Sequence, residues 1–451
     1  MRVGVPAMGP AAAPRVTLAA AAWLGDPNTR VVLLGTALLG VSAGIVGVFL
    51  ILRRQALVGD VVGHATLPGI AIAFLVLESI SPGSGKSTAG LLTGAFLSGL
   101  AGAGVMLFLE RKTSLKPDAV QAVVLSVFYG LGAALLSVIQ QIPSGNSAGL
   151  KDYLNGKTAT LLASDVMLFA GVAVGLLIVT LLLFKELTLV SFDDEFAAAG
   201  GWPVGWLNTL LMLLVVGITV LGLQSVGLIL VVAALIIPAA AARFWTNEVH
   251  HMAIISAAIG GASAVLGVLA SNAIPRMAAG AAIVLSAGLL FLVSFAFGAE
   301  RGLVLRSIRR RRLVQRMERQ HLLRGLYEIL ERTGQQASVP SPIVSWESAA
   351  ELRSWSRGRL GQLFRWGERE GYLTLASAGV SLSESGVAEG ARLVRNHRLW
   401  ELFMMQYADM AAERVDRDAD EIEHVLDADL IRELEARLTP LQPGNLPPSP
   451  H

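Results

Sequence analysis

The sequence contains no cysteine among its 451 residues. Disulfides, iron–sulfur clusters and thiolate metal sites are therefore excluded, and any metal site must use oxygen and imidazole ligands. Charged residues are also scarce, at 16%, and most of them follow residue 300. Hydrophobic residues make up 53% of the chain and the mean hydropathy is +0.60, which is the composition of a membrane protein.

Nine apolar runs each approach the length of about 20 residues that a helix needs to cross a bilayer. We expect membrane spans near residues 31–52, 61–77, 89–109, 119–141, 160–184, 204–223, 225–242, 252–271 and 277–298. The sixth and seventh runs divide one uncharged stretch, and polar Gln224-Ser225 is the expected turn between them. If either run is re-entrant, the chain has eight spans.

The lysines and arginines of the connecting loops predict the orientation of the chain in the membrane, because cytoplasmic loops carry an excess of them. They gather in alternate loops, at Arg53-Arg54, Arg111-Lys112 with Lys116, Lys185, Arg243, and the arginines from Arg301 to Arg312. The N-terminus is then outside and the C-terminus inside. Residues 1–30 match a signal peptide poorly, since their apolar run ends in Asp26-Pro27-Asn28.

The segment SPGSGKST, residues 81–88, ends like a nucleotide-binding P-loop. The full motif needs a glycine five positions before Gly85, where this chain has Ile80. The predicted topology also puts the segment in an external loop, where no ATP is available. We interpret it as a Gly/Ser turn, and the chain is not expected to be an ATP-hydrolysing enzyme.

Asp60 and His64 are the most informative pair in the membrane part. They are four residues apart, so they share one face of a helix at the start of a membrane span, where ionisable groups are expensive. A carboxylate and an imidazole on one face suit a divalent cation; the alternative is an interfacial Asp that caps the helix beside an unrelated His. Pro68-Gly69 is expected to interrupt the helix just beyond.

The run RRQALVGD at 53–60, followed by HATLPG at 64–69, resembles the permease subunits of ABC importers for manganese, zinc and iron. The segments KELTLVSFDDEFAAAGGWP at 185–203 and SVGLILVVAALIIPAAAA at 225–242 share this resemblance, which covers about residues 24–300. It implies that Asp60 and His64 form the metal site of the translocation path. It also implies that residues 185–203 are the cytoplasmic loop that couples the permease to its ATPase.

The coupling segment has a physical rationale of its own. Acidic residues surround apolar ones in a short amphipathic element, which can dock in a groove of a soluble partner or lie on lipid. Its candidate coupling residues are Glu186, Phe192, Asp193, Glu195, Phe196 and Gly200. A separate ATPase would supply the hydrolysis that this chain lacks.

After residue 300 the composition changes to that of a soluble domain. The basic run at 306–320 is expected to leave the membrane as a helix and to hold anionic lipid head groups. Helical patterns near 318–333, 346–353 and 356–370, followed by short strands at 371–375 and 379–382, predict a winged helix-turn-helix. Its recognition helix carries Arg357, Arg359, Arg365 and Arg369, but Glu368 and Glu370 argue against DNA as a partner.

Candidate metal ligands follow in the last helical segments. His397 and Glu401 are four residues apart. Further along, Asp416, Asp420, Glu423 and His424 follow at helical spacings, so that the last three share one face. A charged, solvated helix would show the same spacing.

The segments RLVRNHRLWELF and DADEIEHVL resemble the metal-binding and dimerisation region of iron- and manganese-dependent repressors, and the resemblance covers about residues 317–440. It implies core ligands at Asp420, Glu423 and His424 and accessory ligands at His397 and Glu401. Asp416 falls where some members of the family have histidine. Asp420 stands where the family has cysteine or glutamate, which suits manganese or another hard ion. His321 aligns with an N-terminal ligand that is usually methionine or aspartate.

These observations predict a mainly α chain, with a polytopic transmembrane helical bundle of eight or nine spans and a cytoplasmic winged-helix and helical metal-sensor-like domain. The expected segments are an extracytoplasmic one at 1–30, a transmembrane permease domain at 31–300, a basic juxtamembrane linker at 301–317, a winged helix-turn-helix at 318–385, metal-binding and dimerisation-like helices at 386–440, and a disordered tail at 441–451.

We expect the permease subunit of an ATP-driven importer in a bacterial inner membrane. Its substrate is Mn²⁺ or, alternatively, Zn²⁺ or Fe²⁺; divalent metal is also a candidate regulator, and no permanently bound cofactor is expected. The expected partners are an ABC ATPase, an extracytoplasmic metal-binding protein, and a second permease copy or a sister permease. A membrane-tethered transcription regulator would not need so many spans, and a proton- or sodium-coupled transporter would not need the docking loop.

Overall fold

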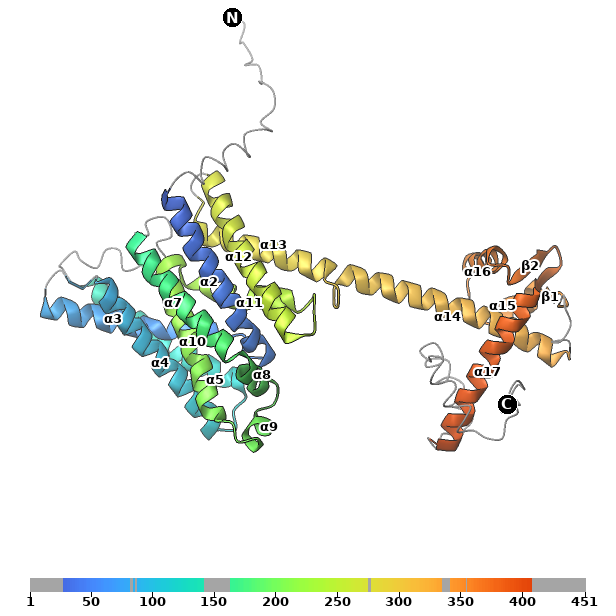
Figure 1. Ribbon diagram of the computed structural model, residues 1–451, viewed down its shortest axis with the longest axis horizontal. Coiled ribbons are helices and arrows are strands. Elements are labelled where there is room, and N and C mark those ends of the chain that lie inside the picture. Colours follow the sequence, from blue (N-terminus) through green and yellow to red (C-terminus); the bar gives the residue numbers. More distant parts are fainter. Residues whose placement is uncertain are drawn as a thin grey trace, which may run out of the picture. The chain divides into compact units, whose positions relative to one another are not determined.

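The computed structural model of the chain describes residues 27–81, 84–85, 87–141, 163–274, 277–334, 341–353 and 355–407. The chain divides into two compact units, residues 1–306 and residues 307–451, which we call the membrane unit and the C-terminal unit. Each unit has a hydrophobic core of its own (Figure 1). The predicted mainly α fold class is confirmed.

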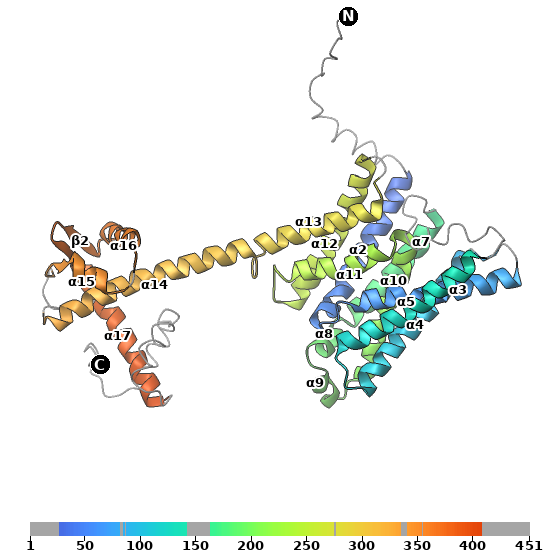
Figure 2. The same ribbon diagram turned by 180° about the vertical axis from the view of Figure 1, so that it is seen from behind.

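The membrane unit is a bundle of long apolar helices (Figures 1 and 2). Each predicted span overlaps one of them: α2 (Pro27–Leu52), α3 (Val58–Ile80), α4 (Thr88–Lys112), α5 (Pro117–Gln140), α7 (Ala163–Leu182), α10 (Val204–Val226), α11 (Leu228–Ala242), α12 (Val249–Ala273) and α13 (Ala279–Phe297). Apolar runs of this length form helices because a helix satisfies every backbone hydrogen bond within the segment, where lipid offers no partner.

Seven helices of the described ranges are long and apolar enough to cross a membrane, and the bent pair of α7 with α8 (Phe184–Phe192) makes up to eight. Helix α11 has only 15 residues. At 1.5 Å per residue it spans about 22 Å, short of the roughly 30 Å of a bilayer core. The expectation of eight spans is therefore supported over that of nine.

The turn before α11 is not where the sequence suggested. Gln224-Ser225 continue α10, and the chain turns instead at Gly227. Its φ of 90° lies in the region that favours glycine. Backbone geometry, rather than side-chain polarity, therefore selects the break.

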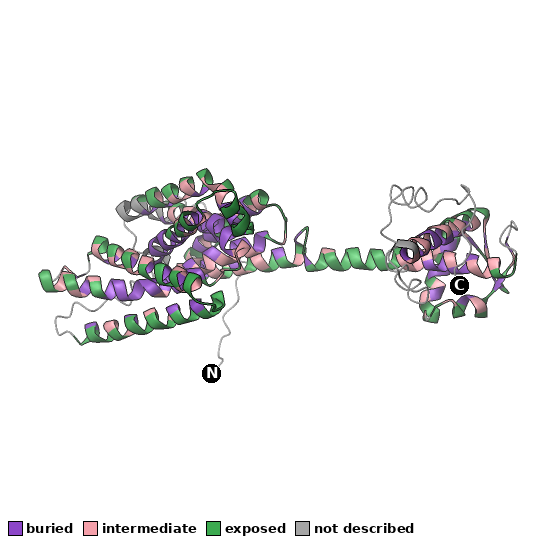
Figure 3. Ribbon diagram, turned by 90° about the horizontal axis from the view of Figure 1, so that it is seen from below, coloured by how far each residue is buried: buried purple, intermediate pink, exposed green. Residues whose placement is uncertain are grey.

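Glycines bring the helices of the membrane unit into close contact. A Cβ atom placed on Gly40 of α2 would lie 2.5 Å from the carbonyl oxygen of Gly260 of α12. Gly69 of α3 meets Gly94 of α4 in the same way. Lipid offers no hydrophobic driving force for helix association, so close van der Waals packing contributes to it, and small residues let the backbones approach closely enough for such packing. The buried residues gather on the inner faces of this bundle (Figure 3).

The P-loop-like segment lies between two helices. Gly85 follows α3 and precedes α4, and its backbone N–H donates a hydrogen bond to Glu78 Oε2 at 3.1 Å. A P-loop joins a strand to a helix. The helix–turn–helix context agrees with the interpretation of this segment as a turn.

The C-terminal unit combines helices with a small antiparallel sheet. Its elements are most of α14 (Leu303–Arg332), β1 (Val344–Ser345), α15 (Trp346–Glu351), α16 (Arg357–Arg369), β2 (Leu373–Ala376), β3 (Gly379–Leu382) and α17 (Glu384–Tyr407). The strand order is β1-β3-β2. Leu326 of α14, Phe364 of α16 and Val380 of β3 are buried in its core.

The helices predicted near 318–333, 346–353 and 356–370 and the strands predicted at 371–375 and 379–382 are present. The basic run is helical, as expected, and continues into the first helix of the winged helix as α14. The strand β1 has only two residues, paired with β3 through Val344 and Val380, and a run that short leaves no period-2 pattern in a sequence.

The close contact at Gly40 yields a test of the packing. The substitution Gly40→Val should lower the thermal unfolding temperature of the purified chain, because its side chain would push α2 away from α12; overpacking of this kind costs about 1–3 kcal/mol. The control is Gly288→Val in α13, where an added Cβ meets nothing within 4 Å. Equal unfolding temperatures for the two variants would contradict the packing of α2 on α12.

Candidate functional site

Asp60 and His64 form a hydrogen-bonded pair in the first turns of α3. The helix begins at Val58, so the Asp60 carboxylate lies in the first turn, where the helix dipole stabilises negative charge. Asp60 Oδ1 and His64 Nδ1 are 3.1 Å apart, and the two side chains are 34% and 22% exposed. The structure therefore brings the predicted pair together in a part-buried position.

The contacts of His64 distinguish its two ring nitrogens. Nδ1 also lies 3.0 Å from the backbone carbonyl oxygen of Asp60. Since both neighbours can only accept, Nδ1 carries the proton and donates it, which leaves the lone pair on Nε2 for a ligand. The ring of Tyr129 on α5 meets His64 edge to face, with 5.3 Å between centroids and 77° between planes. Nothing in the sequence singles out Tyr129, because one aromatic residue in an apolar span is ordinary.

The expected interruption of α3 at Pro68-Gly69 does not occur, because the helix continues to Ile80. Pro68 has no N–H, so the carbonyl of His64 loses its hydrogen bond from that position. Gly69 instead provides the close approach to α4, where its Cβ would lie 2.0 Å from the Gly94 carbonyl oxygen. The proline and glycine therefore shape the helix beside the pair without breaking it.

The pair does not complete a metal site within the described chain. Across the described ranges, no group of three or more His, Cys, Asp or Glu side chains could hold a metal ion. Asp60 and His64 offer one carboxylate and one imidazole, whereas Zn²⁺ takes about four donors and Mn²⁺ about six. Further donors would have to come from water, from the backbone or from another chain.

The coupling segment folds as two short helices rather than one amphipathic element. Helix α8 ends at Phe192, and α9 (Asp194–Ala199) follows directly. Asp193 separates them and caps α9, since its carboxylate accepts a hydrogen bond of 2.8 Å from the backbone N–H of Phe196. Gly200 ends α9. Both helices lie at one end of the bundle (Figures 1 and 2).

Aromatic side chains are exposed along this segment. We call them the docking surface: Phe192, Phe196, Trp202 and Trp206, which are 42% to 67% exposed. Asp193, Asp194 and Glu195 are exposed beside them, whereas Glu186 is half-buried. Exposed apolar groups rimmed by charge are typical of a protein interface.

Arg53 connects the coupling segment to α3, the helix that carries the Asp60–His64 pair. It lies in the turn between α2 and α3, and its Nε donates to Ser191 Oγ of α8 at 3.3 Å. Burial lowers the pKa of Arg53, and the charges of Asp194 and Glu110 oppose this shift. Its Nη2 atom is buried with no hydrogen-bond partner in the described chain. The sequence indicates Arg53 as a marker of orientation and as part of the RRQALVGD run, but it does not indicate this contact, because Ser191 lies 138 residues further along the chain.

In the C-terminal unit, His397 and Glu401 meet inside the protein. Both lie on α17, and His397 Nε2 is 3.2 Å from Glu401 Oε1, with the side chains 5% and 3% exposed. The predicted accessory ligands are thus brought together. His321, the third predicted residue of this unit that the structure describes, is buried on α14.

An arginine already occupies the other side of His397. Arg324 Nη1 lies 2.8 Å from His397 Nδ1, and Arg324 Nε lies 3.3 Å from Glu328 Oε1. Burial raises the pKa of Glu328, while Arg324 and the neighbouring cations oppose this shift. Both ring nitrogens of His397 are therefore engaged by protein groups, and a metal ion could bind there only after one of them moved. Arg324 was not predicted, because an arginine among candidate metal ligands carries no recognisable sequence signal.

The remaining predicted ligands, Asp416, Asp420, Glu423 and His424, lie outside the described residues. Of the predicted recognition-helix arginines, Arg359 is held by an ion pair with Glu318. The others, Arg357, Arg365 and Arg369, have exposed side chains.

Two families match different parts of the chain. Residues 26–298 match the ABC 3 transport family, and residues 383–443 match the iron dependent repressor, metal binding and dimerisation domain. The two resemblances noted in the sequence are thereby confirmed.

Curated relatives share most of the chain. It is 38% identical over 396 residues to the manganese transport system membrane protein MntC of Bacillus subtilis, which covers 88% of each protein. It is 44% identical over 288 residues to the zinc transport system membrane protein TroC of Treponema pallidum, which covers 64% of this chain and 95% of that one.

A solved structure agrees with the sequence relatives. The structure of PsaBC from Streptococcus pneumoniae in complex with Fab has a chain that is 32% identical, with a TM-score of 0.54, over 62% of this chain and 97% of that one. The family match spans more than half of the sequence, and the length of MntC is covered almost throughout. This chain is a multi-pass membrane protein that belongs to the ABC 3 transport family and carries a C-terminal segment of the iron-dependent repressor type.

Proposed function

We propose that this chain is the permease subunit of an ATP-driven importer of divalent metal ions in a bacterial inner membrane, with its C-terminus in the cytoplasm. The observation that carries the proposal is the part-buried Asp60–His64 pair on a membrane-length helix of an ABC 3 family chain. Ionisable groups in a membrane span are costly and mark ion pathways. The similarity to MntC, a manganese transport system membrane protein, supports Mn²⁺ as the cargo, and the similarity to TroC, a zinc transport system membrane protein, supports Zn²⁺ as the alternative.

The pair offers a carboxylate oxygen and the Nε2 lone pair of an imidazole. This donor set suits Mn²⁺ as well as Zn²⁺, because neither donor is a soft thiolate. The described residues supply too few donors, so the proposed site is completed by water or by a second permease, either a copy of this chain or a sister subunit. An extracytoplasmic metal-binding protein would deliver the ion to it.

The docking surface is proposed to receive the ABC ATPase. Phe192 and Phe196 are 65% and 67% exposed, and the acidic residues beside them would select a groove with basic rims. The contact between Arg53 and Ser191 gives a displacement of α8 a direct path to the turn that precedes α3. A movement caused by closure of the ATPase would in this way pass from Arg53 to Asp60, which is seven residues further along the chain.

The C-terminal unit is proposed to sense internal metal. Asp420, Glu423 and His424 would supply the core ligands, with Asp416 and His321 nearby in the repressor pattern. His397 and Glu401 would assist only if Arg324 leaves the imidazole. Metal bound to one conformation of this unit would restrain transport, and a tenfold preference for that conformation is worth about 1.4 kcal/mol.

Removal of either side chain of the Asp60–His64 pair should abolish metal uptake. Asp60→Ala and His64→Ala each delete one of few donors, while the docking surface stays intact. Uptake of ⁵⁴Mn²⁺ into cells that express the full transporter should fall at least tenfold, and the ATPase should still co-purify. Asp118→Ala, which removes an exposed carboxylate at the start of α5, serves as the control and should keep uptake. Uptake near the wild-type level in either pair variant would refute the translocation site.

Loss of the two exposed phenylalanines should separate the permease from its ATPase. Phe192→Ala with Phe196→Ala removes apolar area that is not needed for the fold, so the chain should still insert while the amount of co-purified ATPase drops severalfold. Phe108→Ala, which removes a side chain 61% exposed on α4, should leave the complex unchanged. If the double variant retains the ATPase, the docking surface has been misplaced.

Metal sensing predicts inhibition from the cytoplasmic side. In vesicles, internal Mn²⁺ should inhibit the ATPase activity of the wild-type complex, and Glu423→Ala with His424→Ala should relieve this inhibition because the core ligands are gone. Glu421→Ala with Asp427→Ala removes two nearby carboxylates and should leave inhibition in place. If internal Mn²⁺ does not inhibit the ATPase activity of the wild-type complex at any concentration, the proposed sensing role is wrong.

A further inference from the structure

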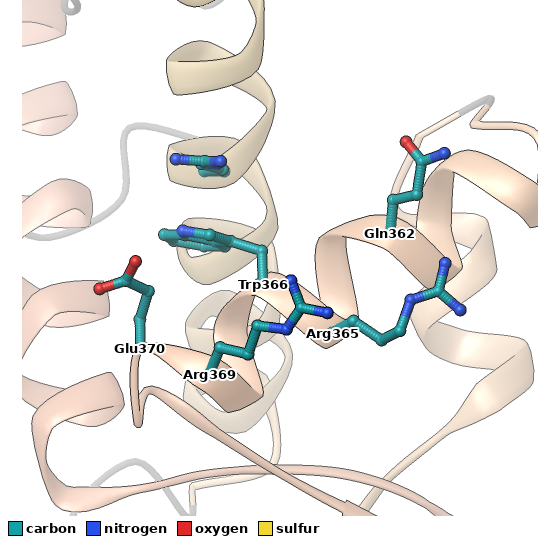
Figure 4. A pocket seen from close by; sticks show the side chains of 6 residues that line it. Gln362, Arg365, Trp366, Arg369 and Glu370 are labelled. Carbon is teal, nitrogen blue, oxygen red and sulfur yellow. The ribbon is translucent and has the colours of Figure 1, made fainter.

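A cavity of about 490 Å³ opens on the C-terminal unit between α14 and α16 (Figure 4). Its walls are Arg319 of α14, four residues of α16, and Glu370 at the end of α16. The four residues are Gln362, Arg365, Trp366 and Arg369. Spacings of three and four place Gln362, Arg365 and Arg369 on one helix face. The cavity is thus built from neighbouring turns of one helix and closed by a second.

The indole of Trp366 organises one side of the cavity. The guanidinium carbon of Arg319 lies 4.8 Å from the centre of the Trp366 ring, which is a cation–π contact. The ring of Tyr372 lies 5.8 Å from the same indole, measured between centroids. Stacking fixes the plane of the Arg319 guanidinium, so a donor is oriented before any ligand arrives.

Positive charge in this cavity has little compensation. The lining contains three guanidinium groups and one carboxylate, that of Glu370. Arg365 and Arg369 are exposed and make no ion pair in the described part of the chain, although they lie four residues apart, where like charges repel. The same unit pairs Arg359 with Glu318, Arg392 with Glu389 and Arg398 with Glu331. The cavity therefore keeps an excess of two positive charges that its neighbours do not neutralise.

We propose that this cavity binds a small phosphorylated molecule through a phosphate monoester group. Guanidinium forks match phosphate oxygens in pairs, and such charge-assisted hydrogen bonds are about twice as strong as neutral ones. A phosphate monoester carries a charge of about −1.5 to −2 at pH 7, which balances the excess. The volume is within the range of roughly 300–1,000 Å³ for small-molecule sites, and the Gln362 amide can meet a polar group of the rest of the ligand.

The same features disfavour a nucleic acid. Each duplex phosphate carries a single charge, and a helix in a groove approaches many of them along its length. On α16 and its last residue, the carboxylates of Glu368 and Glu370 are exposed and would face that backbone. A hollow that holds one dianion close to three guanidinium groups suits a terminal phosphate better.

The test uses the full chain in phosphatidylcholine nanodiscs. Calorimetry should detect binding of adenosine 5′-monophosphate and inorganic phosphate, but not of adenosine, which lacks the phosphate. Arg365→Gln with Arg369→Gln should weaken binding at least tenfold. Arg365→Lys with Arg369→Lys keeps the positive charge but loses the forked guanidinium, so its affinity should lie between those of the wild type and the double Gln variant. Arg357→Gln, an exposed arginine of α16 outside the cavity, should bind like the wild type.

A second arm separates the sources of the phosphate. If a lipid head group is the natural ligand, phosphatidic acid in the nanodisc should compete with adenosine 5′-monophosphate; if the ligand is soluble, it should have no effect. Both results support a phosphate monoester site. The proposal is overturned if wild type binds neither probe at millimolar concentration, if the Arg365→Gln, Arg369→Gln variant binds as well as wild type, or if duplex DNA binds more tightly than the monophosphate with the same dependence on these arginines.

Discussion

A carboxylate and an imidazole at the start of a membrane span need hydrogen-bond partners that lipid cannot supply, and the membrane unit places the two groups so that each is the partner of the other. The spacing of Asp60 and His64 on α3 joins them at 3.1 Å, and Tyr129 covers one edge of the imidazole. Glycine contacts with α4 hold α3 close to its neighbours. In the proposed site, the Asp60 carboxylate and the free nitrogen lone pair of His64 would replace part of the hydration shell of a divalent cation, which the membrane cannot provide.

A second constraint comes from two part-buried arginines. Arg53 is hydrogen-bonded to Ser191 of α8, which joins the turn that leads to Asp60 to the coupling segment. In the C-terminal unit, Arg324 lies between His397 and Glu328. A guanidinium there supplies positive charge without a metal. Under the proposed sensing role, a metal ion would have to displace this internal cation before it could bind His397.

Periodic features of this chain could be predicted from its sequence, whereas contacts between distant residues could not. Long apolar runs located the helices of the membrane unit, and the four-residue spacing located the Asp60–His64 pair. The turn at Gly227 was misplaced because its cause is a backbone dihedral angle rather than polarity. The sequence does not predict the contacts made by Tyr129, Arg53 and Arg324, because each contact joins residues more than 60 positions apart. Pro68 was read as a helix breaker, although packing against α4 and α5 keeps α3 continuous.

The central claim is that His64 binds the transported ion. Pulsed electron paramagnetic resonance of Mn²⁺ in the assembled transporter tests it most directly, since a bound imidazole nitrogen couples to the metal electron spin. The account predicts a ¹⁴N coupling in the wild-type complex that disappears in the His64→Ala complex. Bound Mn²⁺ that shows no nitrogen coupling, or a coupling that survives this substitution, would contradict it.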